Sequence, residues 1–181
     1  MVAEAVEPFR VSVPQAAIDD LRARLKAARW PDDAKRPLTA RGERRARRAA
    51  QGLARIERSV ERLGTSPFVR AERTARILSR VLGIEAEVTD ALVPGGAIRR
   101  IMETMNGSAV EGSVVLVGHE PDLGALAGLL LFGNLEAALP LKKAGACAIE
   151  IEPPARPGGG TLMWAAPPHI LFRISRRKVP A

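Results

Sequence analysis

Apolar and polar positions along this chain of 181 residues predict short strands that alternate with helices. A run of apolar, mostly β-branched residues over 114–117 is typical of a strand buried on both faces of a parallel sheet. Helices are predicted over 40–59, where Leu53 and Ile56 form a core-facing stripe, and over 97–106. Residues 144–151 and 161–165 flank a turn rich in proline and glycine, which predicts an antiparallel hairpin. This alternation predicts an α/β protein.

The stretch from Ser113 to Phe132 is the centre of the predicted fold. Gly118 follows the buried strand and permits a tight turn, and Pro121 suits the first turn of a helix, where its missing N–H costs nothing. His119 is therefore expected at the carboxyl end of a strand, facing the amino end of a helix. Open α/β sheets bind ligands at this edge, and free backbone N–H groups there favour an anion. This position favours a ligand site over a histidine that merely caps a turn.

A second informative stretch runs from Ser66 to Ala75. Ser66 and Pro67 precede a predicted helix whose first turn carries Arg70. A guanidinium group in that position can bind two phosphate oxygens at once, and the helix dipole adds to the attraction. Taken alone, the pattern equally favours a surface arginine on an amphipathic helix.

The composition of the chain argues against several classes of protein: disordered, membrane-spanning, secreted and metal-binding. Apolar residues make up 46% of the chain, which excludes a disordered chain, and the longest apolar run, 123–132, is too short to span a bilayer. The first residues carry Glu4 and Glu7 and lack the apolar stretch of a signal peptide. Cys147 is alone and the sequence holds two histidines, so we expect neither a metal site nor another cofactor. A cytoplasmic protein without a membrane partner is the default expectation.

The chain is basic, with a net charge of +8. Such a charge suits nucleic acid, an anionic surface or a phosphorylated substrate. The helix predicted over 40–59, with Thr39 as its N-cap, is rich in arginine, notably at Arg41, Arg44, Arg45, Arg47, Arg48 and Arg55. The absence of tyrosine makes base stacking platforms scarce, so a solvated helix face is favoured over a nucleic-acid patch.

Residues 33–174 resemble the histidine phosphatase superfamily, and within it the small phosphohistidine phosphatases of the SixA type. The resemblance rests on Arg36-Pro37-Leu38-Thr39-x-x-Gly42, Ser66-Pro67-x-x-Arg70-Ala71-x-x-Thr74-Ala75, Leu92-x-Pro94, Val117-Gly118-His119-Glu120-Pro121 and Lys143-Ala144-Gly145-Ala146. It implies a three-layer α/β/α sandwich with a mostly parallel, phosphoglycerate-mutase-like sheet, in which the strand over 114–117 is central. It also implies a phosphate pocket of two arginines and two histidines.

Within that pocket, Arg70 matches the family's arginine on the helix after Ser-Pro, and His119 matches its second histidine. The implied activity is hydrolysis of phosphohistidine in proteins, so the expected partner is a phosphorylated protein or phosphate. His119 is the candidate catalytic residue, and Ser66, Arg70 and His119 are the candidate phosphate-binding residues. We expect Ser66 and His119 at the same edge of the sheet, with the Arg70 guanidinium close to the His119 ring.

The sequence departs from the family at its start. The family's first strand ends in Arg-His-Gly, whose histidine is the nucleophile, whereas the histidines here are His119 and His169 and neither lies in such a motif. Residues 7–33 instead resemble the amino-terminal segment of α/β-hydrolase epoxide hydrolases. The shared residues are Pro8-Phe9, Val13-Pro14, Leu21-Arg22-x-Arg24-Leu25 and Arg29-Trp30-Pro31. We therefore expect residues 1–32 to be a grafted segment, from a chimeric gene or a recombined start, and residues 33–181 to be the phosphatase-like domain.

Three functions follow from the sequence. The first is a phosphohistidine phosphatase with low or absent turnover in this form. The second is a pseudophosphatase that binds phosphate or a phosphoprotein with Arg70 and His119. The third is a basic nucleic-acid-binding protein that uses the arginine face over 41–48. Within the amino-terminal segment, a helix is predicted over 15–29, and residues 9–13 are predicted to add a strand to the sheet.

Overall fold

The computed structural model describes residues 13–27, 33–107 and 112–176, and the chain divides into two compact units, Met1–Asp32 and Asp33–Ala181. In the first unit, α1 (Gln15–Ala27) confirms the helix predicted after Pro14. The strand predicted over 9–13 lies outside the described residues except for Val13, which is not in a strand. The interpretation of this unit as a grafted segment stays a prediction.

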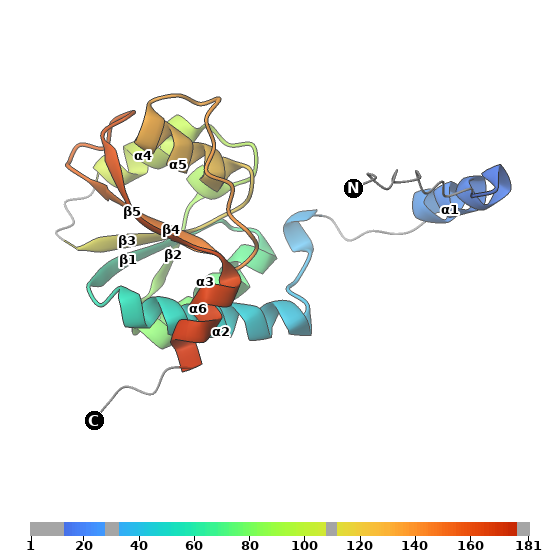
Figure 1. Ribbon diagram of the computed structural model, residues 1–181, viewed down its shortest axis with the longest axis horizontal. Helices are drawn as coiled ribbons and strands as arrows, with labels where there is room; N and C mark the ends of the chain where they lie inside the picture. Colours follow the sequence, from blue (N-terminus) through green and yellow to red (C-terminus); the bar gives the residue numbers. More distant parts are fainter. Residues whose placement is uncertain (1–12, 28–32, 108–111, 177–181) are drawn as a thin grey trace, which may run out of the picture. The chain divides into compact units, whose positions relative to one another are not determined.

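The second unit alternates strands and helices along the chain, as Figure 1 shows. Its strands are β1 (Val60–Thr65), β2 (Ala86–Val88), β3 (Ser113–Val117), β4 (Ala146–Ile151) and β5 (Gly160–Ala166). Its helices are α2 (Ala40–Ile56), α3 (Val69–Leu82), α4 (Ile98–Asn106), α5 (Asp122–Phe132) and α6 (Pro168–Arg176), and its short 3-10 turns are η1 (Asp33–Lys35) and η2 (Asp90–Leu92). The helices predicted over 40–59 and 97–106 and the hairpin are confirmed.

The strands form the middle of three layers. β1, β2 and β3 make a parallel sheet in the order β2-β1-β3, and β4 pairs with β5 in an antiparallel ladder. Thr65 is level with Val88 on one side and with Val117 on the other, so the carboxyl ends of all three parallel strands lie at one edge. Figure 1 shows α4 and α5 on one face of the strands and α2, α3 and α6 on the other.

The position predicted for the strand over 114–117 is wrong. β1, not β3, is the central strand of the parallel sheet, and its Leu63 and Thr65 are almost fully buried. Val114 on β3 is 36% exposed, because no ladder covers the outer edge of β3 within the described parts of the chain. The hairpin β4–β5 forms a separate ladder there instead of continuing the parallel sheet.

Two apolar clusters hold the layers together, one on each face of the strands. Leu116 packs against the cluster of α4 and α5, whereas Val115 and Val117 pack against the cluster of α2 and α3. Alternate residues of a strand point to opposite faces, so the apolar run on β3 serves both clusters. Burial of this kind is the main favourable contribution to folding.

Helix α6 was not predicted, because Pro167-Pro168 has the composition of a turn. Pro168 is instead the first residue of the helix, a position where the missing N–H is tolerated. α6 packs closely on α2, where a Cβ added to Gly52 would meet the backbone of Leu171. Two arginines of α2 also lie against a ring on α6. The guanidinium carbons of Arg45 and Arg48 are 5.9 and 4.5 Å from the centroid of the Phe172 ring.

Candidate functional site

The carboxyl ends of β1 and β3 bring Ser66 and His119 to the same edge of the parallel sheet, as predicted. The Ser66 N–H donates to the Val117 carbonyl at 3.1 Å, which extends the ladder by one bond beyond the strands. The Leu123 N–H donates to the His119 carbonyl at 2.9 Å and ties that residue to the amino end of α5. Backbone bonds from two directions therefore fix the loop that carries His119.

Ser66 holds one side of the His119 ring. The His119 Nε2 lies 3.0 Å from the Ser66 Oγ, which also accepts the Phe68 N–H at 3.3 Å. The Phe68 ring packs against the imidazole with a centroid separation of 5.2 Å. Ser66 is 0% exposed and His119 is 9% exposed, so these contacts are shielded from water.

Arg70 holds the other side of the ring, which confirms the predicted proximity. Its Nη2 lies 3.1 Å from the His119 Nδ1. A guanidinium group only donates, so Nδ1 accepts this bond and the single ring proton of the neutral imidazole resides on Nε2, where it is donated to Ser66. Burial lowers the pKa of His119 below its ordinary value, and the Arg70 charge lowers it further, against smaller opposing effects of Asp33 and Asp122. His119 is therefore a neutral imidazole at pH 7.

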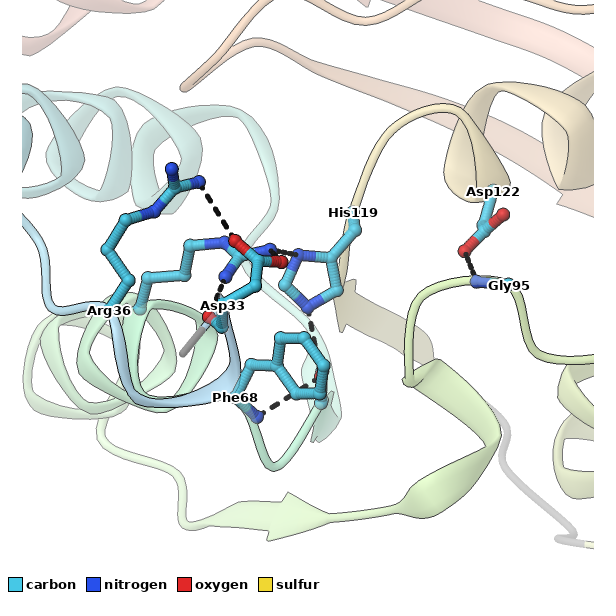
Figure 2. A network of polar contacts seen from close by, with 8 residues as sticks. Asp33, Arg36, Phe68, Gly95, His119 and Asp122 are labelled. Carbon is cyan, nitrogen blue, oxygen red and sulfur yellow. Dashed lines mark hydrogen bonds and ion pairs between the residues drawn. The ribbon is translucent and has the colours of Figure 1, made fainter. Parts of the chain in front are cut away.

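Asp33 and Arg36 complete the network, and sequence reasoning did not single them out as site residues. The Arg70 Nη2 donates to the Asp33 Oδ2 at 2.9 Å, and its Nη1 donates to the Asp33 carbonyl at 2.6 Å. The Arg36 Nη2 lies 3.2 Å from the other carboxylate oxygen, Oδ1. The Asp33 carboxylate therefore bridges the two guanidinium groups, and Figure 2 shows it beside the His119 ring. The spacing of three residues between Asp33 and Arg36 was the sequence feature that could have predicted their ion pair.

A second carboxylate lies beyond His119, at the start of α5. The Asp122 Oδ2 accepts the Gly95 N–H at 2.8 Å, which joins the loop after η2 to the amino end of α5 (Figure 2). One carboxylate oxygen of Asp122 is therefore already hydrogen-bonded to the backbone. Asp122 therefore borders the site without contacting Arg70 in any described hydrogen bond.

Among the described residues of the second unit, neither the other histidine nor the cavity beside α4 belongs to this site. His169, the second histidine, is exposed on α6. A cavity of about 230 Å³ lies between α4 and the parallel sheet, and none of the candidate residues lines it. Within 13–27, 33–107 and 112–176, no group of three or more His, Cys, Asp or Glu side chains is placed to hold a metal ion. None of the helices in those stretches is both long and apolar enough for a membrane span.

The three-layer fold defines an α/β protein with an arginine–histidine pair at the carboxyl edge of its parallel sheet, and comparison with known proteins identifies its class. The model of the histidine phosphatase superfamily (branch 1) matches residues 23–93. The chain belongs to this superfamily.

Individual relatives agree with this assignment. The phosphohistidine phosphatase SixA of Escherichia coli (strain K12) is 29% identical over 140 residues, which cover 75% of this chain and 84% of that protein. An uncharacterized protein of Picosynechococcus sp. (strain PCC 7002) is 39% identical over 121 residues, covering 65% of this chain and 73% of that protein. The structure of the protein histidine phosphatase SixA complexed with tungstate superposes with a TM-score of 0.68 at 27% identity, covering 79% of this chain and 91% of that one.

These findings confirm the predicted family and the predicted phosphoglycerate-mutase-like fold class. The superfamily match begins at residue 23, within the segment that we compared with epoxide hydrolases. That second resemblance is not tested by the comparisons and stays a prediction. The roles of Ser66, Arg70 and His119 are likewise proposals, which rest on the geometry described above.

Proposed function

We propose that this chain binds the phosphoryl group of a phosphorylated protein, phosphohistidine in the first place, and that it does so without forming a covalent intermediate. The observation that carries the proposal is the 3.1 Å contact between the Arg70 Nη2 and the His119 Nδ1 at the carboxyl edge of the sheet. A fixed positive charge and a neutral imidazole lie side by side there, at the start of two helices.

Each residue has a distinct part in this proposal. Arg70 supplies a permanent charge and several parallel N–H donors, the arrangement that suits phosphate oxygens. His119 accepts from the Arg70 Nη2 with its Nδ1 and so fixes the guanidinium beside the ring, while its Nε2–H is donated to Ser66. Ser66 orients the ring, because its Oγ accepts the Nε2–H bond while the Phe68 N–H fixes the hydroxyl oxygen. Pre-oriented donors of this kind stabilise an anion at small cost in reorganisation.

The covalent route is disfavoured by the state of the ring. Attack at phosphorus needs an unprotonated nitrogen in line with the leaving group. In His119 the Nδ1 lone pair accepts the Arg70 bond, and Nε2 carries the proton donated to Ser66. The other histidine of the sequence, His169, is exposed on α6 and has no described contact with Arg70.

Similarity supports phosphate over other anions. The relative from Escherichia coli is named as a phosphohistidine phosphatase, and the SixA structure holds tungstate, an oxyanion that mimics phosphate. The nucleic-acid alternative is weaker, because Arg45 and Arg48 stack on Phe172 and Arg45 also donates to the Lys143 carbonyl at 3.1 Å. Two members of the arginine face are therefore engaged within the fold.

Calorimetric titration with inorganic phosphate and with tungstate tests the proposal. We expect millimolar or weaker dissociation constants for phosphate, a binding free energy on the order of 4 kcal/mol. The Arg70→Ala variant should lose binding, while His169→Ala should bind as the unmodified chain does. Equal binding by the Arg70→Ala variant would overturn the proposal.

Incubation with a phosphohistidine donor separates this proposal from an active phosphatase. We expect no phosphoenzyme. An acid-labile phosphate that maps to His119 or His169 would establish the covalent route and replace the binding function by an enzymatic one.

A further inference from the structure

The Asp33 carboxylate has the contacts that a bound anion would have. One of its oxygens accepts from the Arg70 Nη2 at 2.9 Å, and the other lies 3.2 Å from the Arg36 Nη2. Both guanidinium groups therefore converge on a single carboxylate, which Figure 2 shows beside the His119 ring. Carboxylate and phosphate oxygens bind guanidinium groups in the same way, so one position on Arg70 serves either anion but not both.

We infer that Asp33 is an internal competitor for the phosphate site: its carboxylate occupies the place of a phosphoryl group on Arg70 and leaves when phosphate binds. Arg36 and Arg70, now bridged by Asp33, then hold the phosphate oxygens together. This inference rests on the proposed function and adds to it a second cationic ligand, Arg36, and a residue that sets the affinity, Asp33.

Exposure identifies the carboxylate as the part that moves. The Asp33 and Arg36 side chains are 58% and 55% exposed, whereas the Arg70 side chain is 20% exposed. Asp33 belongs to a three-residue turn, while Arg70 is on a helix of 14 residues. The carboxylate end of the Asp33–Arg70 pair is exposed to solvent, and an ion pair at the surface contributes little to stability, so its replacement by a doubly charged anion on Arg70 costs little.

The Asp33→Asn variant tests the inference, because asparagine has nearly the same shape and lacks the charge. Calorimetric titration at low ionic strength, with inorganic phosphate and separately with tungstate, should show binding about three- to tenfold tighter than in the unmodified chain. The gain combines the loss of the competing ion pair with the loss of repulsion between like charges. Adding Arg36→Gln to Asp33→Asn should weaken binding about tenfold relative to Asp33→Asn alone.

Glu103→Gln is the matched control for net charge. Glu103 is an exposed residue near the end of α4, the end that leads toward the start of β3 rather than to the edge with His119. This variant should bind phosphate as the unmodified chain does. A gain equal to that of Asp33→Asn would show an effect of net charge alone and would overturn the inference.

The remaining outcomes separate this inference from the proposed function. If Asp33→Asn binds phosphate no more tightly while Arg70→Ala still loses binding, Asp33 is not a competitor and the proposed function stands. If the Asp33→Asn, Arg36→Gln double variant binds as tightly as Asp33→Asn, Arg36 is not a ligand and the inference is wrong in that part. If no variant, including Asp33→Asn, binds phosphate or tungstate, both the inference and the proposed function fail.

Discussion

Replacement of Ser66 by alanine removes the hydroxyl oxygen on which the site is assembled. That oxygen accepts the His119 Nε2–H at 3.0 Å and the Phe68 N–H at 3.3 Å, in a residue that is 0% exposed. Ser66→Ala therefore leaves two donors without an acceptor. Water cannot replace the oxygen at a fully buried position without opening the site.

The structure permits an estimate of the cost. A buried donor that loses its acceptor costs about 1–3 kcal/mol. The hydrogen bond from the Phe68 N–H is long and only partly buried, so its loss should cost an energy at the lower limit of this range. Loss of the buried His119 bond should cost an energy nearer the middle of the range. The sum is about 2–3 kcal/mol, a large part of the 5–15 kcal/mol or so by which domains are usually stable.

Urea unfolding monitored by circular dichroism measures this change. With a slope of roughly 2 kcal/mol per molar, the midpoint of Ser66→Ala should fall by about 1–1.5 M with the slope unchanged. Ser113→Ala is the matched control: the Ser113 hydroxyl donates to the Glu57 Oε2 at 3.2 Å, and its removal strands no donor. We expect the control to cost about 0.5 kcal/mol or less. A Ser66→Ala variant within 0.5 kcal/mol or so of the unmodified chain would refute the hydrogen-bond account of His119 orientation.

Three further predictions concern the ring, the helix packing and the arginine face. The pKa of His119 is lowered from 6.5 in the folded chain, so the unfolded chain binds more protons below that pH. The contribution of His119 to stability is therefore full above pH 6.5 and is lost as the pH falls toward the folded pKa. His119→Gln should flatten this part of the pH profile of the free energy of unfolding. Gly52→Ala should destabilise the fold by about 2 kcal/mol in thermal or urea unfolding, because the added Cβ meets the Leu171 backbone. Gly42→Ala on the same helix meets only side-chain atoms, of Leu38 at 3.3 Å and of Thr39 at 3.4 Å, and should cost clearly less; equal effects would contradict the packing argument. Single-stranded DNA should not bind at physiological ionic strength in a salt titration followed by anisotropy, and tight, salt-dependent binding would restore the nucleic-acid function.

Much of the second unit was predictable from local patterns. Thr39 was predicted as an N-cap, and its side chain accepts the Gly42 N–H at 3.1 Å. Strand β3, the hairpin and the position of His119 before α5 follow from apolar runs and turn residues whose effects are local. The closeness of Arg70 and His119 was predictable too, because the carboxyl ends of parallel strands share one edge.

The errors have nonlocal causes. The apolar run of β3 indicates burial on both faces, but it carries no information about which strands lie beside it, and β3 is an edge strand of the parallel sheet within the described residues. α6 was missed because it begins at the second residue of Pro167-Pro168, a pair that has the composition of a turn. Asp33 was missed as a contact of Arg70 because the pair is 37 residues apart in sequence, and only the packing of η1 against α3 brings them together.

The most direct test of the phosphate site is a crystal structure of this chain with tungstate, located by its anomalous scattering. We expect the oxyanion beside the His119 ring with its oxygens within hydrogen-bond distance of the Arg70 guanidinium, no covalent bond to either histidine, and the Asp33 carboxylate displaced from Arg70. Tungstate bound elsewhere at saturating concentration, or bonded covalently to His119 or His169, would contradict the account.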